Sequence, residues 1–398
     1  MIRIISISFI LVLLACSSPS TVHEIENPTS AHSKFPRLFT DTKGAITMSW
    51  YEVRGDSALL LASTLSQESW SKPILISSAA STSWFVNWAD FPTILSQNGQ
   101  PIVAHYLRKI PGNKFSYNVE LTTAPFQKTV TAHTDSTATE HGFVSMQSTS
   151  DSTFYAIWLD GRNTGGSADH SSHGVGDLLT AMTVRGAEFD HDLNKLSESE
   201  IDQTACDCCN TALARIPDGL IAAYRNRTAD EVRDIYTSRL IDGSWSEGVP
   251  VHNDNWEIAA CPVNGPALST VGDMVALLWF TGASDVPKVK LSFSMDAGLN
   301  FSTPILLESG HVLGRVDVEM MTDQTAWVSY LNKTQHSTEL VLKKISPAGA
   351  VLKNLTIPDL DPARATGFPQ ITKKGDAILI AWTDISSTNP KIKTAVIR

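Results

Sequence analysis

One pattern recurs seven times along the chain: a short apolar strand, a polar turn, and a second apolar strand that ends near an aromatic residue. Each turn carries Gly, Asp, Asn or Ser, which tight hairpin connections need. The aromatic positions lie about 50 to 65 residues apart, which is the period of β-propeller blades. The copies are 36–52, 92–108, 143–160, 211–226, 266–281, 317–332 and 369–384, with aromatic positions Trp50, Tyr106, Trp158, Tyr224, Trp279, Tyr330 and Trp382.

Each hairpin is followed by room for two further strands, and no segment has a sustained helical period. Four-stranded units repeated around an axis make a β-propeller. The sequence therefore predicts one all-β propeller domain over 35–398, with seven blades favoured. Six blades with an irregular terminal unit is the alternative, and the regular spacing disfavours a pair of β-sandwiches. The last unit is one strand short, and the segment 22–27 can supply that strand and close the ring.

The first residues are typical of a secretory signal peptide, with the positive charge of Arg3 before an apolar run over 4–15. The run is too short to span a bilayer comfortably. It ends at Cys16, and this ending resembles the lipobox of bacterial lipoproteins. The resemblance implies that 1–15 is removed and that Cys16 carries the lipid. An ordinary cleaved signal or a short buried helix is the alternative.

The segment 16–34 begins with serines and a proline and is expected to be a flexible tether. If Cys16 is lipidated, as the resemblance implies, Ser17 after it favours the outer membrane of the cell envelope, by analogy with enteric bacteria. The net charge of −10 argues against nucleic acid and against an anionic membrane surface as partners. We therefore expect a monomer that contacts the membrane through its lipid anchor only.

The segment 292–304 contains the pattern S-x-D-x-G-x-x-F, formed by Ser294, Asp296, Gly298 and Phe301. It resembles the Asp-box, or bacterial neuraminidase repeat, of the sialidase superfamily. Weaker copies occur at 63–73 and 238–248. In that superfamily the motif is a structural turn on the outer part of a blade, which implies the same role here.

Three arginines extend the resemblance to sialidases. Arg37 and the following 51–54 resemble the first sialidase blade, Arg225 resembles the second arginine of that family, and Arg315 is a weaker candidate for the third. The resemblance implies an exo-sialidase-type glycosidase in which arginine forks bind a sugar carboxylate. The alternative for Arg37 and Arg315 is a pairing with a neighbouring Asp at a strand end.

The catalytic pattern of sialidases is incomplete in this sequence. Those enzymes use a tyrosine nucleophile activated by a glutamate, but the corresponding strand here begins after Cys208, Cys209 and Asn210. Tyr330 is an available tyrosine, and Asp56 or Asp90 could act as the general acid. The sequence therefore leaves open whether the chain is an enzyme.

Four of the five cysteines lie in two short clusters, Cys206, Cys208 and Cys209 in one and Cys261 in the other. Both clusters lead into inner strands of consecutive blades, so we expect them to meet at one face of the propeller. An even number of thiols outside the cytoplasm favours disulfides, with Cys209 the expected partner of Cys261.

Copper or zinc bound by sulfur and imidazole is the second explanation for the cysteines, and a redox or other thiol role is the third. The imidazoles expected on the same face are His141, His170 and His173.

Aromatic and polar residues gather in the loops of this face, a composition that suits sugar sites and protein-binding surfaces alike. The resemblance favours recognition of a glycan or another polar anionic ligand in the axial funnel. The alternative function is a non-catalytic propeller that binds a metal or a partner protein through its cysteines and histidines.

Overall fold

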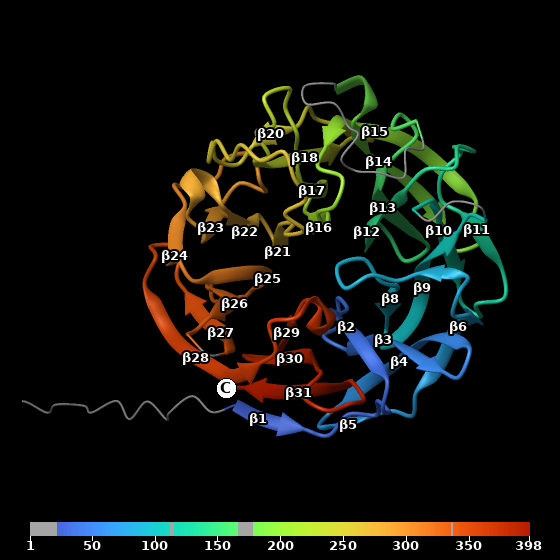
Figure 1. Cartoon of the computed structure of the whole chain (residues 1–398), viewed down its shortest axis with the longest axis horizontal. Helices are drawn as coiled ribbons and strands as arrows, with labels where there is room; N and C mark the ends of the chain where they lie inside the picture. Colours follow the sequence, from blue (N-terminus) through green and yellow to red (C-terminus); the bar gives the residue numbers. More distant parts are fainter. Residues whose placement is uncertain (1–21, 112–114, 166–177, 336) are drawn as a thin grey trace, which may run out of the picture.

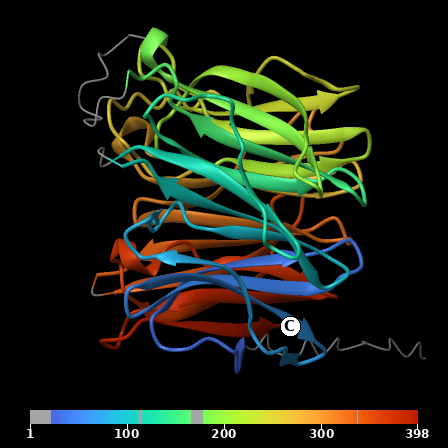
Figure 2. The ribbon, with the colours of Figure 1, turned by 90° about the vertical axis from the view of Figure 1, so that its right-hand side faces the viewer.

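The computed structural model describes residues 22–111, 115–165, 178–335 and 337–398. These residues form seven antiparallel sheets arranged around a central axis (Figure 1). In the edge-on view of Figure 2, the blades are stacked and their strands run across the thickness of the ring. The seven-bladed prediction is confirmed, whereas the six-bladed ring and the pair of sandwiches are wrong.

The first three blades follow one another in chain order. Blade 1 comprises β2 (Ser33–Thr40), β3 (Ile46–Arg54), β4 (Ser57–Ser66), β5 (Ser69–Trp70) and β6 (Ile74–Ala80). Blade 2 comprises β7 (Trp84–Phe85), β8 (Thr93–Gln97), β9 (Gln100–Lys109), β10 (Tyr117–Thr123) and β11 (Thr129–Thr131). Blade 3 comprises β12 (His141–Ser148), β13 (Thr153–Asp160), β14 (Met182–Asp190) and β15 (Lys195–Ala205).

The remaining blades complete the ring. Blade 4 comprises β16 (Ala212–Ile216), β17 (Gly219–Arg225), β18 (Ile235–Ile241), β19 (Ser244–Trp245) and β20 (Val249–Pro250). Blade 5 comprises β21 (Ala267–Val271), β22 (Met274–Thr281), β23 (Lys288–Ser294) and β24 (Ile305–Ser309). Blade 6 comprises β25 (Val312–Met320), β26 (Ala326–Lys333), β27 (Thr338–Ile345) and β28 (Val351–Leu360). Blade 7 comprises β29 (Gln370–Lys374), β30 (Ala377–Asp384), β31 (Lys391–Ile397) and β1 (Val22–Ile25).

Helix is confined to short 3₁₀ turns in the described part of the chain. These are η2 (Leu178–Thr180), η3 (Ala283–Asp285) and η4 (Arg364–Thr366). No helix among the described residues is long and apolar enough to cross a membrane.

The recurring aromatic residues lie on the second strand of every blade, and all except the half-buried Tyr106 are buried. They pack between blades: one apolar cluster joins Trp50 of β3 to Leu379 of β30 and Val396 of β31. The hydrophobic core is therefore a series of layers between neighbouring sheets, as the face-to-face packing of alternating strands requires.

The N-terminal strand closes the ring. β1 pairs antiparallel with β31, with Val22 opposite Ile397 and Ile25 opposite Thr394. The side chain of Asn27 extends this contact by donating to the main-chain oxygen of Ile392 at 2.9 Å. The proposed closing strand is confirmed, because residues 22–25 cover the otherwise unpaired edge of β31. The expected tether over 16–34 therefore overlaps β1 and the first residues of β2, which begins at Ser33.

Three inner strands begin with a bulge, at the register shifts Lys34/Arg37 of β2, Gly142/Ser145 of β12 and Gly314/Asp317 of β25. A residue with positive φ lies in each bulge. Its main-chain N–H donates a hydrogen bond to a side-chain oxygen from the preceding blade. The pairs are Phe35 with Thr383 Oγ1 at 3.0 Å, Phe143 with Asp90 Oδ2 at 2.8 Å, and Arg315 with Asn264 Oδ1 at 2.7 Å.

Two of these bulges depend on a preceding glycine. A Cβ at Gly142 would lie 2.3 Å from Asp90 Oδ2, and a Cβ at Gly314 would lie 2.3 Å from Asn264 Oδ1. The missing side chain lets the neighbouring polar group reach the main chain. The bulges thereby bring polar side chains to the entrances of the inner strands.

The segment that resembles an Asp-box connects β23 and β24. Ser294 Oγ donates to Asp296 Oδ1 at 2.7 Å, and the N–H of Gly298 donates to Ser294 Oγ at 2.9 Å. Asp296 also accepts from the main chain and side chain of Asn300. Phe301 packs against the apolar clusters of blades 4 and 5. The segment is thus a turn with a partly buried aromatic residue, between the two outer strands of blade 5.

Candidate functional site

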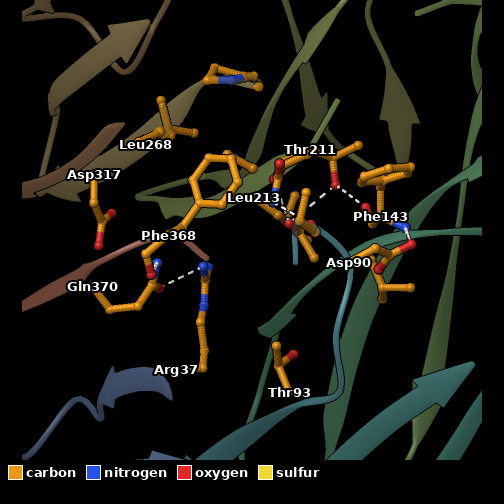
Figure 3. Close-up of a pocket in the computed structure, with 18 of the residues that line it drawn as sticks. Arg37, Asp90, Thr93, Phe143, Thr211, Leu213, Leu268, Asp317, Phe368 and Gln370 are labelled. Carbon is orange, nitrogen blue, oxygen red and sulfur yellow. Dashed lines mark hydrogen bonds between the residues drawn. The ribbon is translucent and has the colours of Figure 1, made fainter. Parts of the chain in front are cut away.

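A cavity of about 110 Å³ lies on the propeller axis, where the inner strands of all seven blades begin (Figure 3). A second cavity of about 280 Å³ continues along the axis and shares Arg37, Asp317 and Gln370 with the first. Together they form an axial channel whose wall is made by strand entrances rather than by long loops.

Strand register places one residue of each blade at the same level of this channel. In every blade it pairs with the residue just before the recurring aromatic position, and it lines the cavity. We call these seven residues the axial ring: Arg37, Thr93, Ser145, Ala212, Ala267, Asp317 and Gln370. The ring is polar on blades 6, 7, 1, 2 and 3 and small and apolar on blades 4 and 5.

Arg37 brings a positive charge into the channel. Its Nη1 donates to Gln370 Oε1 at 2.8 Å (Figure 3). The orientation of the Gln370 amide is fixed, because its Nε2 donates to the main-chain oxygens of Phe368 and Pro369. The bond to Gln370 is the one hydrogen bond of the Arg37 guanidinium within the described residues. The other N–H groups of Arg37 are therefore available to a ligand.

Asp317 lies in the same ring, but its oxygens are engaged. Oδ2 accepts from the N–H of Ile371 at 2.8 Å, and Oδ1 accepts from the N–H of Val318 at 2.9 Å. Burial raises the pKa of Asp317 to about 6, against the opposing charge of Arg37. At neutral pH this carboxylate is therefore mostly ionised and held by main-chain donors.

Asp90 is a buried acid at the same entrance. Its Oδ2 accepts from Phe143, and burial raises the pKa of Asp90 to about 8, with a smaller contribution from the charge of Glu140. A neutral Asp90 at pH 7 can donate a hydrogen bond, as well as accept one.

Asn210 offers a further acceptor. Its Nδ2 donates to the main-chain oxygen of Ala89 at 3.0 Å, whereas its buried Oδ1 has no hydrogen-bond partner among the described residues. Thr211 beside it is satisfied, since its Oγ1 donates to the Phe143 oxygen at 2.7 Å. A buried polar atom left without a partner is costly, so the Asn210 acceptor is suited to a ligand or to water.

Arg225 does not face the channel. It is 1% exposed, and its guanidinium donates to the main-chain oxygens of Asn264, Arg233 and Phe280. It also stacks on the Trp256 ring, 4.9 Å from the centroid. Its donors are consumed by the scaffold, so the expected ligand-binding arginine is a structural one.

Arg315 is likewise consumed by the scaffold. It donates to Thr366 Oγ1 and to the main-chain oxygens of Pro362 and Ala363, and it lies 4.8 Å from the centroid of Trp88. The three arginines therefore do not converge. The arrangement implied by the sialidase resemblance is not formed, because two of its members hold loops in place.

The remaining catalytic candidates are dispersed. Tyr330 is fully buried, with its hydroxyl 3.4 Å from Glu308 Oε2 of β24, and Asp56 is exposed in the turn between β3 and β4. Neither lines the channel. Of the six catalytic candidates, Arg37 and Asp90 line the first axial cavity, which the whole axial ring also lines.

The cysteines meet as expected from the topology. The sulfur atoms of Cys206, Cys208 and Cys209 lie within 4.8 Å of one another, and Cys261 interacts with Cys208. No disulfide joins these four residues, so the disulfide expectation is not realised in the structure. The contact shown for Cys261 is Cys208, whereas Cys209 was the expected partner.

His141 does not join this cluster. His141 belongs to a separate group with His133 and Asp135, and its Nε2 lies 3.0 Å from Asp135 Oδ2. His170 and His173 lie outside the described residues, as does Cys16.

The propeller fold is shared with solved structures of other proteins. No protein-family model matches this chain, and no curated protein matches it. The chain is similar to a solved ulvan lyase of polysaccharide lyase family PL25, with a TM-score of 0.53 and 11% identity over 93% of each chain. It is also similar to polysaccharide lyase Uly1, with a TM-score of 0.50 and 8% identity over 96% of this chain and 93% of that one. Identities this low show a shared propeller fold and no more.

Proposed function

We propose that this propeller recognises a carboxylate-bearing glycan in its axial channel, with Arg37 as the residue that binds the carboxylate. The observation that carries the proposal is the guanidinium of Arg37, which lies in the channel with one N–H group bonded to Gln370. An arginine fork matches a carboxylate in bidentate fashion. The similarity to polysaccharide lyases supports a glycan as the ligand class.

The axial ring leaves space across the channel from this arginine, on blades 4 and 5. Ala212 and Ala267 are the small members of the ring, and the Asn210 acceptor adjoins them. A sugar ring placed against the alanines would direct its carboxylate to Arg37 and a hydroxyl to Asn210. The neutral Asp90 would supply a second polar partner at the same entrance.

We propose recognition without sialidase chemistry. Tyr330 is buried away from the channel, and Arg225 and Arg315 are bonded to main-chain oxygens. Exo-sialidase-type hydrolysis is the first reaction to assay, and the proposal predicts that a fluorogenic sialoside is bound but not cleaved.

The test is calorimetric titration with sialic acid and uronic-acid oligosaccharides, each paired with its carboxyl-reduced counterpart. Arg37→Ala should weaken binding of the acidic ligands at least about tenfold, the low end for a charge-assisted hydrogen bond. Arg398→Ala, which removes an exposed arginine, should bind as the wild type does. Equal affinity for acidic and reduced ligands, or wild-type affinity in folded Arg37→Ala, would overturn the proposal.

We also propose that the protein is lipid-anchored in the bacterial cell envelope through Cys16, with the outer membrane favoured. The support is the apolar run that ends at this cysteine. Metabolic labelling with an alkyne fatty acid should mark the wild type and leave Cys16→Ser unlabelled. Membrane fractionation of the labelled protein then assigns the membrane.

A further inference from the structure

Two loops bring four cysteines together beside the axial channel. Cys206 directly follows β15, Cys208 and Cys209 lie just before β16, and Cys261 lies in the segment that leads to β21. The first three are buried, whereas Cys261 is exposed. The cluster therefore joins the entrance of blade 4 to the entrance of blade 5 and has one side open to solvent.

The sulfur positions have the spacing of a thiolate coordination shell. Cys206 Sγ lies 3.5 Å from Cys209 Sγ and 3.9 Å from Cys208 Sγ. Four sulfurs placed tetrahedrally at a Zn–S distance of about 2.3 Å are about 3.8 Å apart. A disulfide would need an S–S distance of about 2.05 Å. The observed separations thus fit atoms gathered around a common centre better than atoms bonded in pairs.

Hydrogen-bond donors surround the sulfur atoms. Arg233 Nη1 donates to Cys206 Sγ at 3.3 Å, and the main-chain N–H of Asn264 donates to Cys209. Arg233 is itself oriented by Glu231, with Nη2 2.8 Å from Oε2. Cationic and N–H donors aimed at sulfur stabilise a thiolate shell, and a second layer that fixes those donors is typical of metal sites.

The surroundings of the buried sulfur atoms combine apolar packing with a positive charge. Cys206, Cys208 and Cys209 belong to an apolar cluster with Met182, Ala205 and their neighbours, yet a buried arginine reaches into it. A buried positive charge needs a negative partner. Thiolates bound to a cation give Arg233 such a partner in addition to Glu231.

We propose that Cys206, Cys208, Cys209 and Cys261 bind one thiophilic cation, either Zn²⁺ with all four sulfurs or Cu⁺ with the three buried ones. Soft sulfur ligands select these ions. The ion would cross-link the entrances of blades 4 and 5, whose main chains already touch: a Cβ at Gly265 would lie 2.0 Å from the oxygen of Asn210. Because Asn210 and Gly265 line the axial cavity, the ion would fix one wall of it.

Elemental analysis of the full-length protein, purified in detergent without chelator, tests the site directly. We expect one zinc or copper ion per chain. Cys206→Ser should retain less than a tenth of that metal, whereas Cys16→Ser, which removes the one cysteine outside the cluster, should retain all of it. Cys261→Ser separates the two ions, since it should release Zn²⁺ from a four-sulfur shell and leave Cu⁺ in a three-sulfur shell.

A second readout covers variants that fold poorly. Alkylation of the wild-type protein should modify Cys206, Cys208 and Cys209 only after the metal has been stripped with a chelator. Cys261 should be protected in a four-sulfur Zn²⁺ shell and reactive beside a three-sulfur Cu⁺ shell. Cobalt reconstitution should give a thiolate-to-cobalt charge-transfer band that weakens in Cys261→Ser. A disulfide-linked peptide joining the two loops, metal-free protein whose thiols react equally with and without chelator, or full metal content in folded Cys206→Ser would each overturn the proposal.

Discussion

Arg37 and Gln370 are hydrogen-bonded across the junction at which the ring closes, with 2.8 Å between Nη1 and Oε1. They are 333 positions apart in the chain and occupy the same level of the first and last blades. The closure therefore positions the one axial-ring arginine, and its orientation depends on the fixed amide of Gln370.

Replacing that amide with an acid should disable Arg37. In Gln370→Glu the new carboxylate can pair with the guanidinium and compete with an anionic ligand. We expect affinity for an acidic glycan to fall at least about tenfold by calorimetry, a change of about 1.4 kcal/mol. Gln370→Ala, which frees Arg37 without adding a charge, should lose less affinity. Unchanged affinity in Gln370→Glu would contradict the assigned role of Arg37.

Asp90 should make stability depend on pH. Its folded-state pKa of about 8 lies above its ordinary value of 3.8, so the native protein holds a proton that the unfolded chain releases. The stability from this group is fully present below about pH 4 and is lost as pH rises toward 8, at up to about 1.4 kcal/mol per unit. Denaturant unfolding of Asp90→Asn should show a smaller decline over this window than the wild type.

The control for that experiment is Asp56→Asn, because Asp56 is an exposed acid in a turn. It should reproduce the wild-type pH profile. If Asp90→Asn also reproduces that profile, the carboxyl is not held neutral by burial.

Removing the Arg225 side chain should destabilise the fold rather than act on the ligand alone. Arg225→Ala leaves the main-chain oxygens of Asn264, Arg233 and Phe280 without this donor. Each buried unsatisfied group costs about 1–3 kcal/mol, so we expect a loss of at least about 3 kcal/mol in the free energy of unfolding. Arg215→Ala, at an exposed position of β16, is the matched control and should change little. A fully stable Arg225→Ala that loses binding would instead favour a ligand role.

Asp296→Ala should lower stability and leave binding intact. The carboxylate bonds Ser294 and both the main chain and side chain of Asn300, so its loss should cost about 1–3 kcal/mol. Thermal unfolding measures the first effect and calorimetric titration the second. Loss of ligand binding in the folded variant would mean that this turn communicates with the channel.

The fold follows closely from sequence periodicity. The seven aromatic positions all lie on second strands, because alternating apolar residues can be buried between sheets in one register only. The meeting of Cys261 with the other cysteines also follows from topology, since consecutive blades begin on the same face. These features depend on where strands lie, which short-range patterns encode.

The directions of the side chains at the channel were harder to predict, because a bulge changes which face of a strand the following side chains point to. Arg225 and Arg315 lie near strand ends that face the channel entrance, yet neighbouring main-chain oxygens hold both guanidinium groups in the scaffold. Arg315 also lies in the bulge of β25. Gln370 was not predicted as a site residue, although the repeat contains a signal for it. It pairs with the residue just before the aromatic position of its blade, as Arg37 and Asp317 do in theirs. Aligning the seven repeats by their aromatic residues would have revealed the axial ring.

The pairing of β1 with β31 also imposes an order on biosynthesis. A chain made from its N-terminus presents residues 22–25 before the other strands of the propeller, but their partner strand at 391–397 is made after those strands. Until then the facing sides of blades 1 and 7 stay uncovered, and a contact between sequence-distant strands is slow to form. The ring can therefore close only after β31 has been made, and until then the open propeller presents unpaired strand edges and apolar faces to other chains.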